Sequence, residues 1–381
     1  MPIKNILILF PSPHIAYSPT TLGIYDALSK TCNVTIYAPQ PKGFEVSSMA
    51  NRNIVYFNFN TNRFKKVLAL PAFFFNKIKR LFNKSFAIGK LSIYEFVCFN
   101  NFKNSLQQIA FKNYDEVIAV DLMMLYLSSF YCKKVSFLSL ELTDNEKNFL
   151  KLLPNNFFKA IVIQTKIRYD YLFAVDKENL FLLQNSPIYK PLLAKKTIEN
   201  TIIFNGTATA WFGLYHSLNF VKKYPQFTIV FKGAVPLNDL KLIITNYKSL
   251  VDNGNIIINK EYMESNDMLS FMSQYEVGFC FYDLSYPHIN TFNYKTAPSG
   301  KMFAYLAAGV PIVSINIDGL KIIEDFEAGI LINDFEPSTI LAAINKIKSN
   351  YNFYKNNCAK AAAFYSFDKN VAPFVHFLEN G

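Results

Sequence analysis

Short apolar runs alternate with segments of helical periodicity along this chain. Apolar runs of about four to eight residues are typical of strands buried in a parallel sheet, and their alternation with helices is typical of βαβ units. In the first half of the chain, helical periodicity is found at 22–29 and 94–111. The predicted strands of that half lie at 4–10, 34–37, 114–121, 135–140, 160–164 and 181–187.

The same alternation begins again after a stretch without periodicity. Residues 187–200 contain prolines and a lysine pair, and they are predicted to form a linker. Beyond the linker, strands are predicted at 201–206, 228–232, 256–258, 277–282 and 312–315, and helices at 262–274, 338–350 and 357–378. The pattern predicts an α/β protein with two Rossmann-like domains, 1–190 and 200–356, followed by a helical tail at 357–381.

The segment 296–315, TAPSGKMFAYLAAGVPIVSI, predicts a loop, a helix, a tight stop and a buried strand. Ser299 is expected to cap the helix, because its hydroxyl can accept a hydrogen bond from a free backbone amide. Gly309 suits the left-handed residue that ends a helix, and Pro311 prevents the helix from continuing. This segment is the most clearly patterned part of the chain.

The start of this predicted helix is a candidate anion site. The amides of Gly300, Lys301 and Met302 point out of the helix N-terminus, where the helix dipole places partial positive charge. Gly300 allows a ligand to approach closely, and Lys301 adds a full charge. On physical grounds alone, an ordinary capped helix of an α/β fold explains the segment equally well.

The order and spacing of PSGKMFAYLAAGVPIV favour the functional interpretation. This stretch resembles the segment usually written Pro-x-Lys-Leu-Phe-Glu-Tyr-Leu-Ala-Ala-Gly-x-Pro-Val-Val in GT-B glycosyltransferases, and the chain is similar to a divergent member of the family 4 or group 1 enzymes. The resemblance implies two Rossmann-like domains that face each other across a cleft. It also implies that the helix start holds the diphosphate of a nucleotide sugar, and that the tail 357–381 packs back on the N-terminal domain.

The chain departs from this family at two acidic positions. The family's Glu-x7-Glu pattern falls at Thr296 and Ala304, neither of which is acidic. In relatives, the first glutamate typically contacts the sugar and the second holds the ribose hydroxyls, so the resemblance does not extend to these two contacts. The departure indicates a divergent branch or, as an alternative, an inactive copy.

A loop of small residues, GTATAWFG at 206–213, follows the first predicted strand of the second domain. Gly206 and Thr207 in this loop can bring backbone amides near a ligand. The arginine and lysine with which the family commonly binds the diphosphate are missing from this loop. Positive charge at the site is expected instead from Lys232, Lys295 or Lys301.

Three side chains at predicted strand ends of the first domain are candidates for catalysis. His14 lies in the loop after the first strand, and Asp121 and Glu141 each follow a later strand. Carboxyl ends of parallel strands meet at one edge of a sheet, and histidine titrates near neutral pH. The resemblance implies that this edge lines the catalytic cleft, beside the sugar or the acceptor hydroxyl. The alternative is a surface histidine and two acids at capping or surface positions.

Composition narrows the class of protein. Hydrophobic residues make up 51% and charged residues 18% of the chain, which excludes a disordered protein. A net charge of +11 favours an anionic partner. The five cysteines contain no CxxC pair, which indicates a reducing compartment. Because the apolar run at 6–10 is too short for a signal peptide, we expect a cytoplasmic protein.

No metal site and no cofactor are predicted. The chain contains no Asp-x-Asp triplet, and its four histidines show no ligand spacing. A nucleotide diphosphate sugar is expected as a donor substrate rather than a cofactor. Lysines and helix amides would then stabilise the nucleoside diphosphate as it leaves.

Residues 62–84, NRFKKVLALPAFFFNKIKRLFNK, form a basic and aromatic segment. Its lysines and arginines are interleaved with large apolar residues, a combination that can lie in an acidic membrane interface. The alternative is a solvated basic face over a core face. Pro71 is expected to break the segment into two short pieces.

These features predict a metal-independent, hexosyltransferase-like glycosyltransferase of cell-surface polysaccharide synthesis. It would move a sugar from a nucleotide diphosphate donor to a glycan or lipid-linked glycan acceptor at the inner membrane face. Two other classes stay open: a nucleotide-sugar epimerase of the same architecture, and a non-catalytic basic binding module. The epimerase would need further acid and base residues in the cleft. Nucleic acid is not expected as a partner, because no recognition motif is present and the lysines are spread along the chain.

Overall fold

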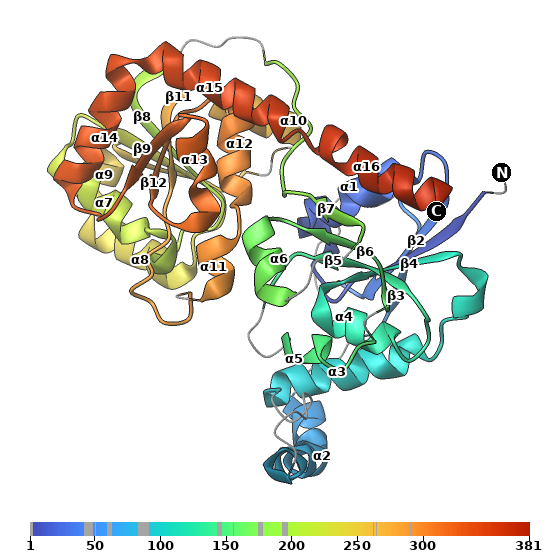
Figure 1. Ribbon diagram of the computed structural model, residues 1–381. Helices are drawn as coiled ribbons and strands as arrows, with labels where there is room; N and C mark the ends of the chain where they lie inside the picture. The colour runs from blue at the N-terminus through green and yellow to red at the C-terminus, as the bar shows by residue number, and fades with distance from the viewer. Residues whose placement is uncertain are drawn as a thin grey trace. The chain divides into compact units, whose positions relative to one another are not determined.

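Parallel strands and their connecting helices make up two units of this chain. The computed structural model describes residues 3–41, 49, 51–58, 63–82, 91–142, 147–154, 156–173, 178–192, 197–261, 263, 265–289 and 291–381 (Figure 1). Unit 1 comprises Met1–Gln184 and Asp368–Gly381, and unit 2 comprises Asn185–Phe367. The predicted tail, 357–381, is divided between the two units after Phe367.

Unit 1 is built on a seven-stranded parallel sheet with the order β3-β2-β1-β4-β5-β6-β7. All residues of β4 and β5 are buried, as expected for central strands with both faces covered. The strand order reverses direction between β1 and β4, which makes their carboxyl ends a topological switch point. The strands are β1 (Asn5–Leu9), β2 (Asn33–Pro39), β3 (Ile54–Phe57), β4 (Glu116–Val120), β5 (Val135–Ser139), β6 (Phe158–Ile163) and β7 (Leu180–Leu182).

The last helix of the chain packs on unit 1. Lys4 Nζ donates a hydrogen bond to the carbonyl oxygen of Leu378 at 2.8 Å. The ring of Phe181 lies 5.5 Å from that of Phe374 and 5.6 Å from that of Phe377. The helices of this unit are α1 (Pro19–Leu28), α2 (Arg63–Phe82), α3 (Ile93–Leu106), α4 (Asp121–Ser128), α5 (Lys147–Leu150), α6 (Lys166–Leu172) and α16 (Phe367–Asn380), the last beginning at the final residue of unit 2.

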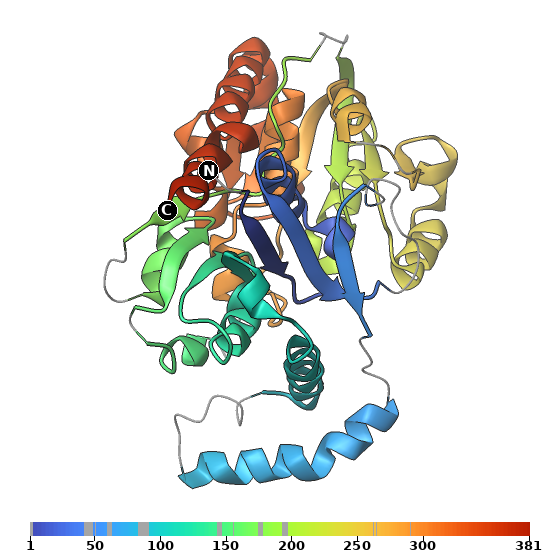
Figure 2. The same ribbon diagram turned by 90° about the vertical axis from the view of Figure 1, so that its right-hand side faces the viewer.

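Helix α2 is continuous, and the predicted break at Pro71 is wrong. Proline removes one backbone donor, but both halves of α2 are held on α3. Lys66 Nζ lies 5.4 Å from the centre of the Tyr94 ring, and the ring of Phe73 lies 6.0 Å from that of Phe96. Figure 2 shows α2 crossing α3. Among the described helices, none has the combination of length and hydrophobicity needed to span a bilayer.

Unit 2 is built on a six-stranded parallel sheet with the order β10-β9-β8-β11-β12-β13. Two parallel α/β sheets are therefore present, as the apolar runs predict. The strands are β8 (Ile198–Asn205), β9 (Thr228–Lys232), β10 (Ile256–Asn259), β11 (Tyr275–Cys280), β12 (Ile312–Ile315) and β13 (Gly329–Ile332). The helices are α7 (Leu214–Lys223), α8 (Leu237–Asn246), α9 (Lys248–Asp252), α10 (Ser265–Met272), α11 (Phe292–Thr296), α12 (Gly300–Ala308), α13 (Ile322–Asp325), α14 (Pro337–Ser349) and α15 (Tyr351–Phe364).

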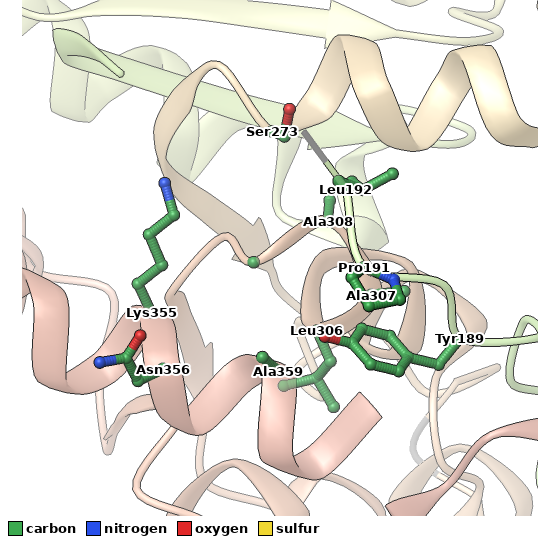
Figure 3. A pocket seen from close by; sticks show the side chains of 11 residues that line it. Tyr189, Pro191, Leu192, Ser273, Leu306, Ala307, Ala308, Lys355, Asn356 and Ala359 are labelled. Carbon is green, nitrogen blue, oxygen red and sulfur yellow. The ribbon is translucent and has the colours of Figure 1, made fainter. Parts of the chain in front are cut away.

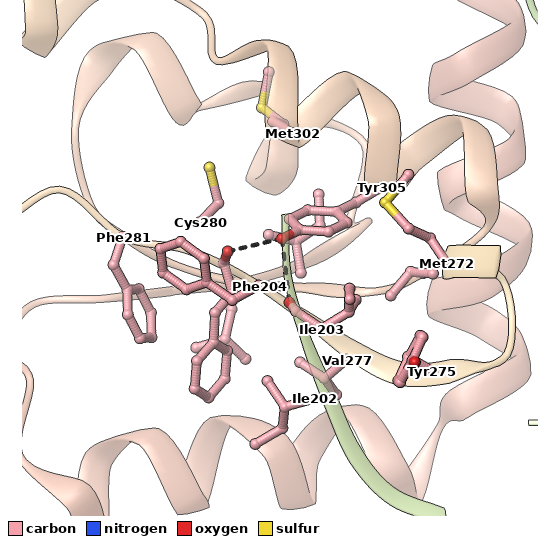
Figure 4. Close-up of a cluster of buried hydrophobic side chains, with 14 of the residues drawn as sticks. Ile202, Ile203, Phe204, Met272, Tyr275, Val277, Cys280, Phe281, Met302 and Tyr305 are labelled. Atoms are coloured by element: carbon pink, nitrogen blue, oxygen red, sulfur yellow. Dashed lines mark hydrogen bonds between the residues drawn. The ribbon is translucent and has the colours of Figure 1, made fainter. Parts of the chain in front are cut away.

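Tyr305 fixes α12 on the sheet of unit 2. Its buried hydroxyl accepts a hydrogen bond from the amide of Asn205 at 2.7 Å and lies 3.1 Å from the carbonyl oxygens of Ile203 and Phe279 (Figure 4). A Cβ atom at Gly278 would lie 2.8 Å from the Tyr305 ring, so the strand needs glycine there. One side chain thus ties α12 to the carboxyl ends of β8 and β11.

The two places at which the chain changes unit are bonded to each other within unit 2. The amide of Tyr189 donates to Ser366 Oγ at 2.9 Å, and the amide of Phe367 donates to the carbonyl oxygen of Pro187 at 3.3 Å. The linker is therefore held against the residues between α15 and α16.

Candidate functional site

Two glycine turns hold the loops after β8 and β9 together at the carboxyl edge of the unit 2 sheet. Gly206 has a φ of +92° and Gly233 a φ of +135°, conformations that favour glycine. The amide of Gly206 donates to the carbonyl oxygen of Lys232 at 2.8 Å. A Cβ atom on Gly233 would lie 2.5 Å from the carbonyl oxygen of Gly206. In the loop that follows, Thr207 is exposed.

The start of α12 lies beside this loop, but its cap differs from the prediction. Ser299 occupies the N-cap position, yet its hydroxyl makes no capping bond and instead accepts a hydrogen bond from Tyr282 Oη at 2.9 Å. The predicted N-cap position of Ser299 is confirmed, but the predicted capping bond is wrong, because the hydroxyl is bonded to Tyr282 instead. The first amides of a helix have no acceptor within the helix. Because Ser299 makes no capping bond, it does not satisfy the amides of Gly300 and Lys301.

Lys301 is the most unusual group at this edge. Its ammonium nitrogen is fully buried and has no hydrogen-bond partner among the described residues. It lies 4.7 Å from the centre of the Phe204 ring, 4.4 Å from that of Phe212 and 5.8 Å from that of Tyr282. Burial lowers the pKa of Lys301 to about 8, because removal from water disfavours the charged form. The rings offer a partial counter-charge, and no described carboxylate lies within hydrogen-bonding distance of the ammonium.

Gly206 and Lys301 are brought together as the sequence predicts for two parts of one site. A Cβ atom on Gly206 would lie 3.5 Å from Lys301 Cε. Gly300 lies close to Asn185, because a Cβ atom there would lie 3.0 Å from Asn185 Nδ2. The loop after β8 and the first turn of α12 therefore form one small cluster around the buried ammonium.

Met302, which the sequence also places at this site, faces the interior. Its side chain is fully buried, and its amide is bonded to the thiol of Cys280 at the end of β11. Burial raises the pKa of the Cys280 thiol, while the charge of Lys301 and hydrogen bonds from Ser299, Ser314 and Met302 oppose that rise. The Met302 amide therefore already has a partner.

The other two candidate lysines lie in different surroundings. Lys232 is buried, and its Nζ donates to Asn259 Oδ1 at 2.8 Å and to the carbonyl oxygen of Glu261. Burial lowers the pKa of Lys232 as well, but its hydrogen bonds hold it in the sheet. Lys295 in α11 is exposed. Lys301 is thus the candidate lysine that combines burial with the lack of a partner among the described residues.

Two uncharged residues occupy the positions where the family has glutamates. Thr296 is buried, and its hydroxyl donates to the carbonyl oxygen of Phe292 at 2.7 Å within α11. Ala304 lies on α12 and is partly exposed. Neither side chain offers the acceptor oxygens with which a carboxylate binds hydroxyl groups.

A histidine–carboxylate pair beside loop 206–213 was not predicted. His216 Nε2 lies 2.8 Å from Asp283 Oδ2, and its ring stacks on Phe335 with a centroid distance of 4.1 Å. Burial alone would raise the pKa of Asp283, but hydrogen bonds from Ser285 and His216 outweigh it, so the pKa lies below its usual value. The pair is separated by 67 residues, so no local pattern reveals it.

The three catalytic candidates lie in unit 1. His14 is exposed and comes just before a short 3-10 turn at Ile15–Tyr17, after β1. Asp121 follows the neighbouring strand β4, so both lie at the switch point of the sheet. Glu141, which follows β5, is exposed. Their catalytic role stays a prediction.

Asp121 is a strained and partly buried acid. Its φ of +59° is unusual for a residue other than glycine. Its Oδ1 accepts hydrogen bonds from the amides of Leu140 at 2.8 Å and Glu141 at 2.9 Å. Burial raises the pKa of Asp121 to about 7, against the opposing effects of these amides and of the buried Arg168. Asp121 therefore holds the ends of β4 and β5 together, a role the sequence did not indicate.

A cavity of about 170 Å³ lies at the opposite end of α12. Leu306 and Ala308 from the last turn of α12, Leu192 from the linker and Lys355 from α15 contribute to its wall (Figure 3). It is separated from the Lys301 cluster by the length of the helix, so it is not part of that site. Among the described residues, no group of three or more potential metal ligands is found.

No protein-family model matches the sequence, and no curated protein matches it either. Solved structures do match over the whole chain. Alr3699/HepE from Anabaena, solved with UDP-glucose, aligns with a TM-score of 0.65 and 12% identity over 99% of this chain and 98% of its own. The chain has the fold of the GT-B glycosyltransferases.

Two further GT-B structures show the same similarity. A glycosyltransferase from Rickettsia africae aligns with a TM-score of 0.64 and 14% identity over 100% of both chains. A UDP-forming trehalose-phosphate synthase from Burkholderia xenovorans aligns with a TM-score of 0.61 and 12% identity over 100% of this chain and 99% of its own. At these identities the similarity defines the GT-B fold and not the activity.

Replacing Lys301 should stabilise the protein. In Lys301→Met, an apolar chain of similar length removes the cost of burying the ammonium, and a pKa lowered from 10.5 to about 8 corresponds to about 3 kcal/mol. We expect urea unfolding at pH 7 to show a gain of about 1–3 kcal/mol. Between pH 8 and 10.5 the folded wild type binds fewer protons than the unfolded chain, so its stability rises and the gain shrinks.

The matched control is Lys346→Met, which replaces an exposed lysine of α14 and should leave stability within about 0.5 kcal/mol of wild type. A loss of stability in Lys301→Met, or a gain that does not change with pH, would contradict the buried and unpaired ammonium.

Proposed function

We propose that this protein is a glycosyltransferase that uses a nucleoside diphosphate sugar as its donor. The observation that carries the proposal is the buried ammonium of Lys301, which has no partner among the described residues, at the start of α12. Burying an unpaired charge costs free energy, and folded proteins keep such groups chiefly at functional sites. A diphosphate would supply the missing negative charge.

The geometry around Lys301 supports a phosphate ligand. The uncapped first amides of α12 carry the positive end of the helix dipole, and Gly300 has no side chain to block approach. The loop at Gly206 lies beside the Lys301 side chain, because a Cβ atom on Gly206 would lie 3.5 Å from Lys301 Cε. Charge that develops on the leaving nucleoside diphosphate would be stabilised by Lys301 and these amides, with no metal ion required.

The proposals for the donor and for the acceptor rest on different observations. UDP and UDP-glucose are bound in structures of Alr3699/HepE, so UDP is the first nucleotide to test here. Unit 2 would bind the donor. Unit 1 would bind a glycan or lipid-linked glycan, with His14 and Asp121 at the switch point near the acceptor hydroxyl, in the synthesis of a cell-surface polysaccharide.

Nucleotide binding tests this proposal. Isothermal titration of UDP, GDP, ADP and CDP should show binding of one nucleotide, and UDP is expected. Loss of a charge-assisted contact in Lys301→Met should weaken that binding about tenfold to a hundredfold. Binding of the matching nucleoside, which lacks the diphosphate, should change little, and Lys346→Met should bind as wild type does.

Two outcomes would count against the proposal. The first is no binding of any of these nucleotides at millimolar concentration, which would favour a non-catalytic binding module. The second is equal binding by wild type and Lys301→Met, which would place the diphosphate elsewhere.

We also propose that α2 binds an acidic membrane surface on the cytoplasmic side. Its sequence contains six basic residues and no acidic one. Phe74 and Phe75 are 57% and 56% exposed, and Val67, Leu68 and Ile78 are exposed as well. A helix that carries large apolar side chains and only positive charges matches the chemistry of an anionic lipid interface. This contact would bring the enzyme to a lipid-linked acceptor.

Vesicle binding tests the role of α2. Wild type should sediment with vesicles of phosphatidylcholine and phosphatidylglycerol, more weakly with phosphatidylcholine alone, and less at high salt. Phe74→Ser/Phe75→Ser should reduce sedimentation at least about tenfold, because the two phenyl rings would no longer be buried in the lipid interface. Phe353→Ser/Phe364→Ser removes two exposed rings from unit 2 and should sediment as wild type does. Equal loss in both variants, or no loss in the first, would refute the assignment.

A further inference from the structure

A polar groove runs along α3 in unit 1, away from the switch point of the sheet. One part, of about 460 Å³, lies between α3 and the edge strand β3, and a second part, of about 220 Å³, lies between α3 and α2. The two parts share Asn101 and Asn104 in their walls, so they lie next to each other along α3 and are treated together as one groove. We call it the amide groove, after the side chains of Asn58, Asn100, Asn101, Asn104 and Gln108 that line it.

The described lining of the amide groove consists of uncharged residues. No described residue that lines either part carries a charge, although the chain as a whole has a net charge of +11. A site for a nucleotide, a phosphate or an acidic headgroup would require cationic partners. The ligand suited to this groove is therefore neutral and polar.

Three of these side-chain amides form a row along α3 and make no hydrogen bond to the described residues. Asn100, Asn104 and Gln108 follow one another at intervals of four residues, which places them on one side of α3 and its last turn. No side-chain hydrogen bond is found for these three among the described residues, and Asn104 and Gln108 are exposed. Replacing them should therefore cost the fold little, and their amides are available to bond a ligand in the groove.

Aromatic residues complete the wall beside the amides. Tyr56 is partly exposed and lines the same part of the groove, and behind it the buried rings of Tyr37 and Phe57 stack with centroids 4.9 Å apart. Side-chain amides both donate and accept hydrogen bonds, as sugar hydroxyls do. Aromatic rings suit the apolar C–H faces of sugar rings. Amides and aromatic rings without charge are the chemistry of a site for a neutral saccharide.

We propose that the amide groove binds a neutral oligosaccharide, which is the glycan part of the acceptor. The inference deepens the proposed function and rests on it. Leu68 and Ala69 of α2 line the end of the groove next to α3, so the helix proposed to lie on the membrane also forms one wall of the groove. A glycan attached to a membrane lipid would thus meet the groove close to the bilayer.

Saturation-transfer NMR and isothermal titration with neutral oligosaccharides test this proposal. The probes are tri- to hexasaccharides of glucose, galactose and N-acetylglucosamine, and at least one should bind wild type in the millimolar range or tighter. Asn104→Ala/Gln108→Ala removes two hydrogen-bonding amides and should weaken binding at least about tenfold. The control Gln107→Ala/Asn113→Ala removes two exposed amides outside the groove and should stay within about twofold of wild type.

UDP binding, measured on the same samples, separates this proposal from the donor site. It should be unchanged in both double variants. If UDP binds but no oligosaccharide does, the amide groove is not a saccharide site and the donor proposal stands. If an oligosaccharide binds equally well to wild type and Asn104→Ala/Gln108→Ala, the groove is likewise excluded. If the oligosaccharide binds as expected while no nucleotide does, the groove is supported and the transferase proposal fails.

Discussion

The carboxyl edge of the unit 2 sheet is organised around one buried ammonium group that has no partner among the described residues. Lys301 lies among Phe204, Phe212 and Tyr282, and contact with aromatic rings compensates only part of the cost of burying its charge. Two neighbours adjoin this ammonium group: Gly206, where a Cβ atom would lie 3.5 Å from Lys301 Cε, and Ser299, which bonds to Tyr282 rather than to the helix. Burying this charge costs free energy in the free protein, and a bound anion would offset that cost.

The two units offer different chemistry to ligands. Unit 2 presents positive charge at a helix N-terminus, next to the loops after β8 and β11 that Tyr305 ties to the same helix. Unit 1 presents an uncharged groove of amides and aromatic rings beside a basic amphipathic helix. The proposed transferase would use this division by binding an anionic donor on unit 2 and a neutral, membrane-carried acceptor on unit 1. The GT-B fold is compatible with that division, but the local chemistry of each unit is what suggests it.

Local patterns predicted the parts of the fold that depend on local interactions. Buried strands, α12 and the left-handed Gly309, whose φ is +66°, follow from apolar runs and turn residues. The edge strand β3, whose burial pattern is mixed, was missed. The errors at the site have another cause. The hydroxyl of Ser299 pairs with Tyr282, 17 residues away, and Asp121 bonds to amides about 20 residues away, so tertiary contacts decide the state of each side chain.

The proposed role of Lys301 is to bind the diphosphate of a donor. Its most direct test is the pKa of Lys301, followed by the Cε resonance in protein carrying ¹³C-labelled lysine, with and without saturating UDP. The account predicts a pKa of about 8 in the free protein and a clear rise when UDP binds, because the diphosphate stabilises the charged form. An ordinary lysine pKa in the free protein, or a pKa that UDP binding leaves unchanged, would contradict it.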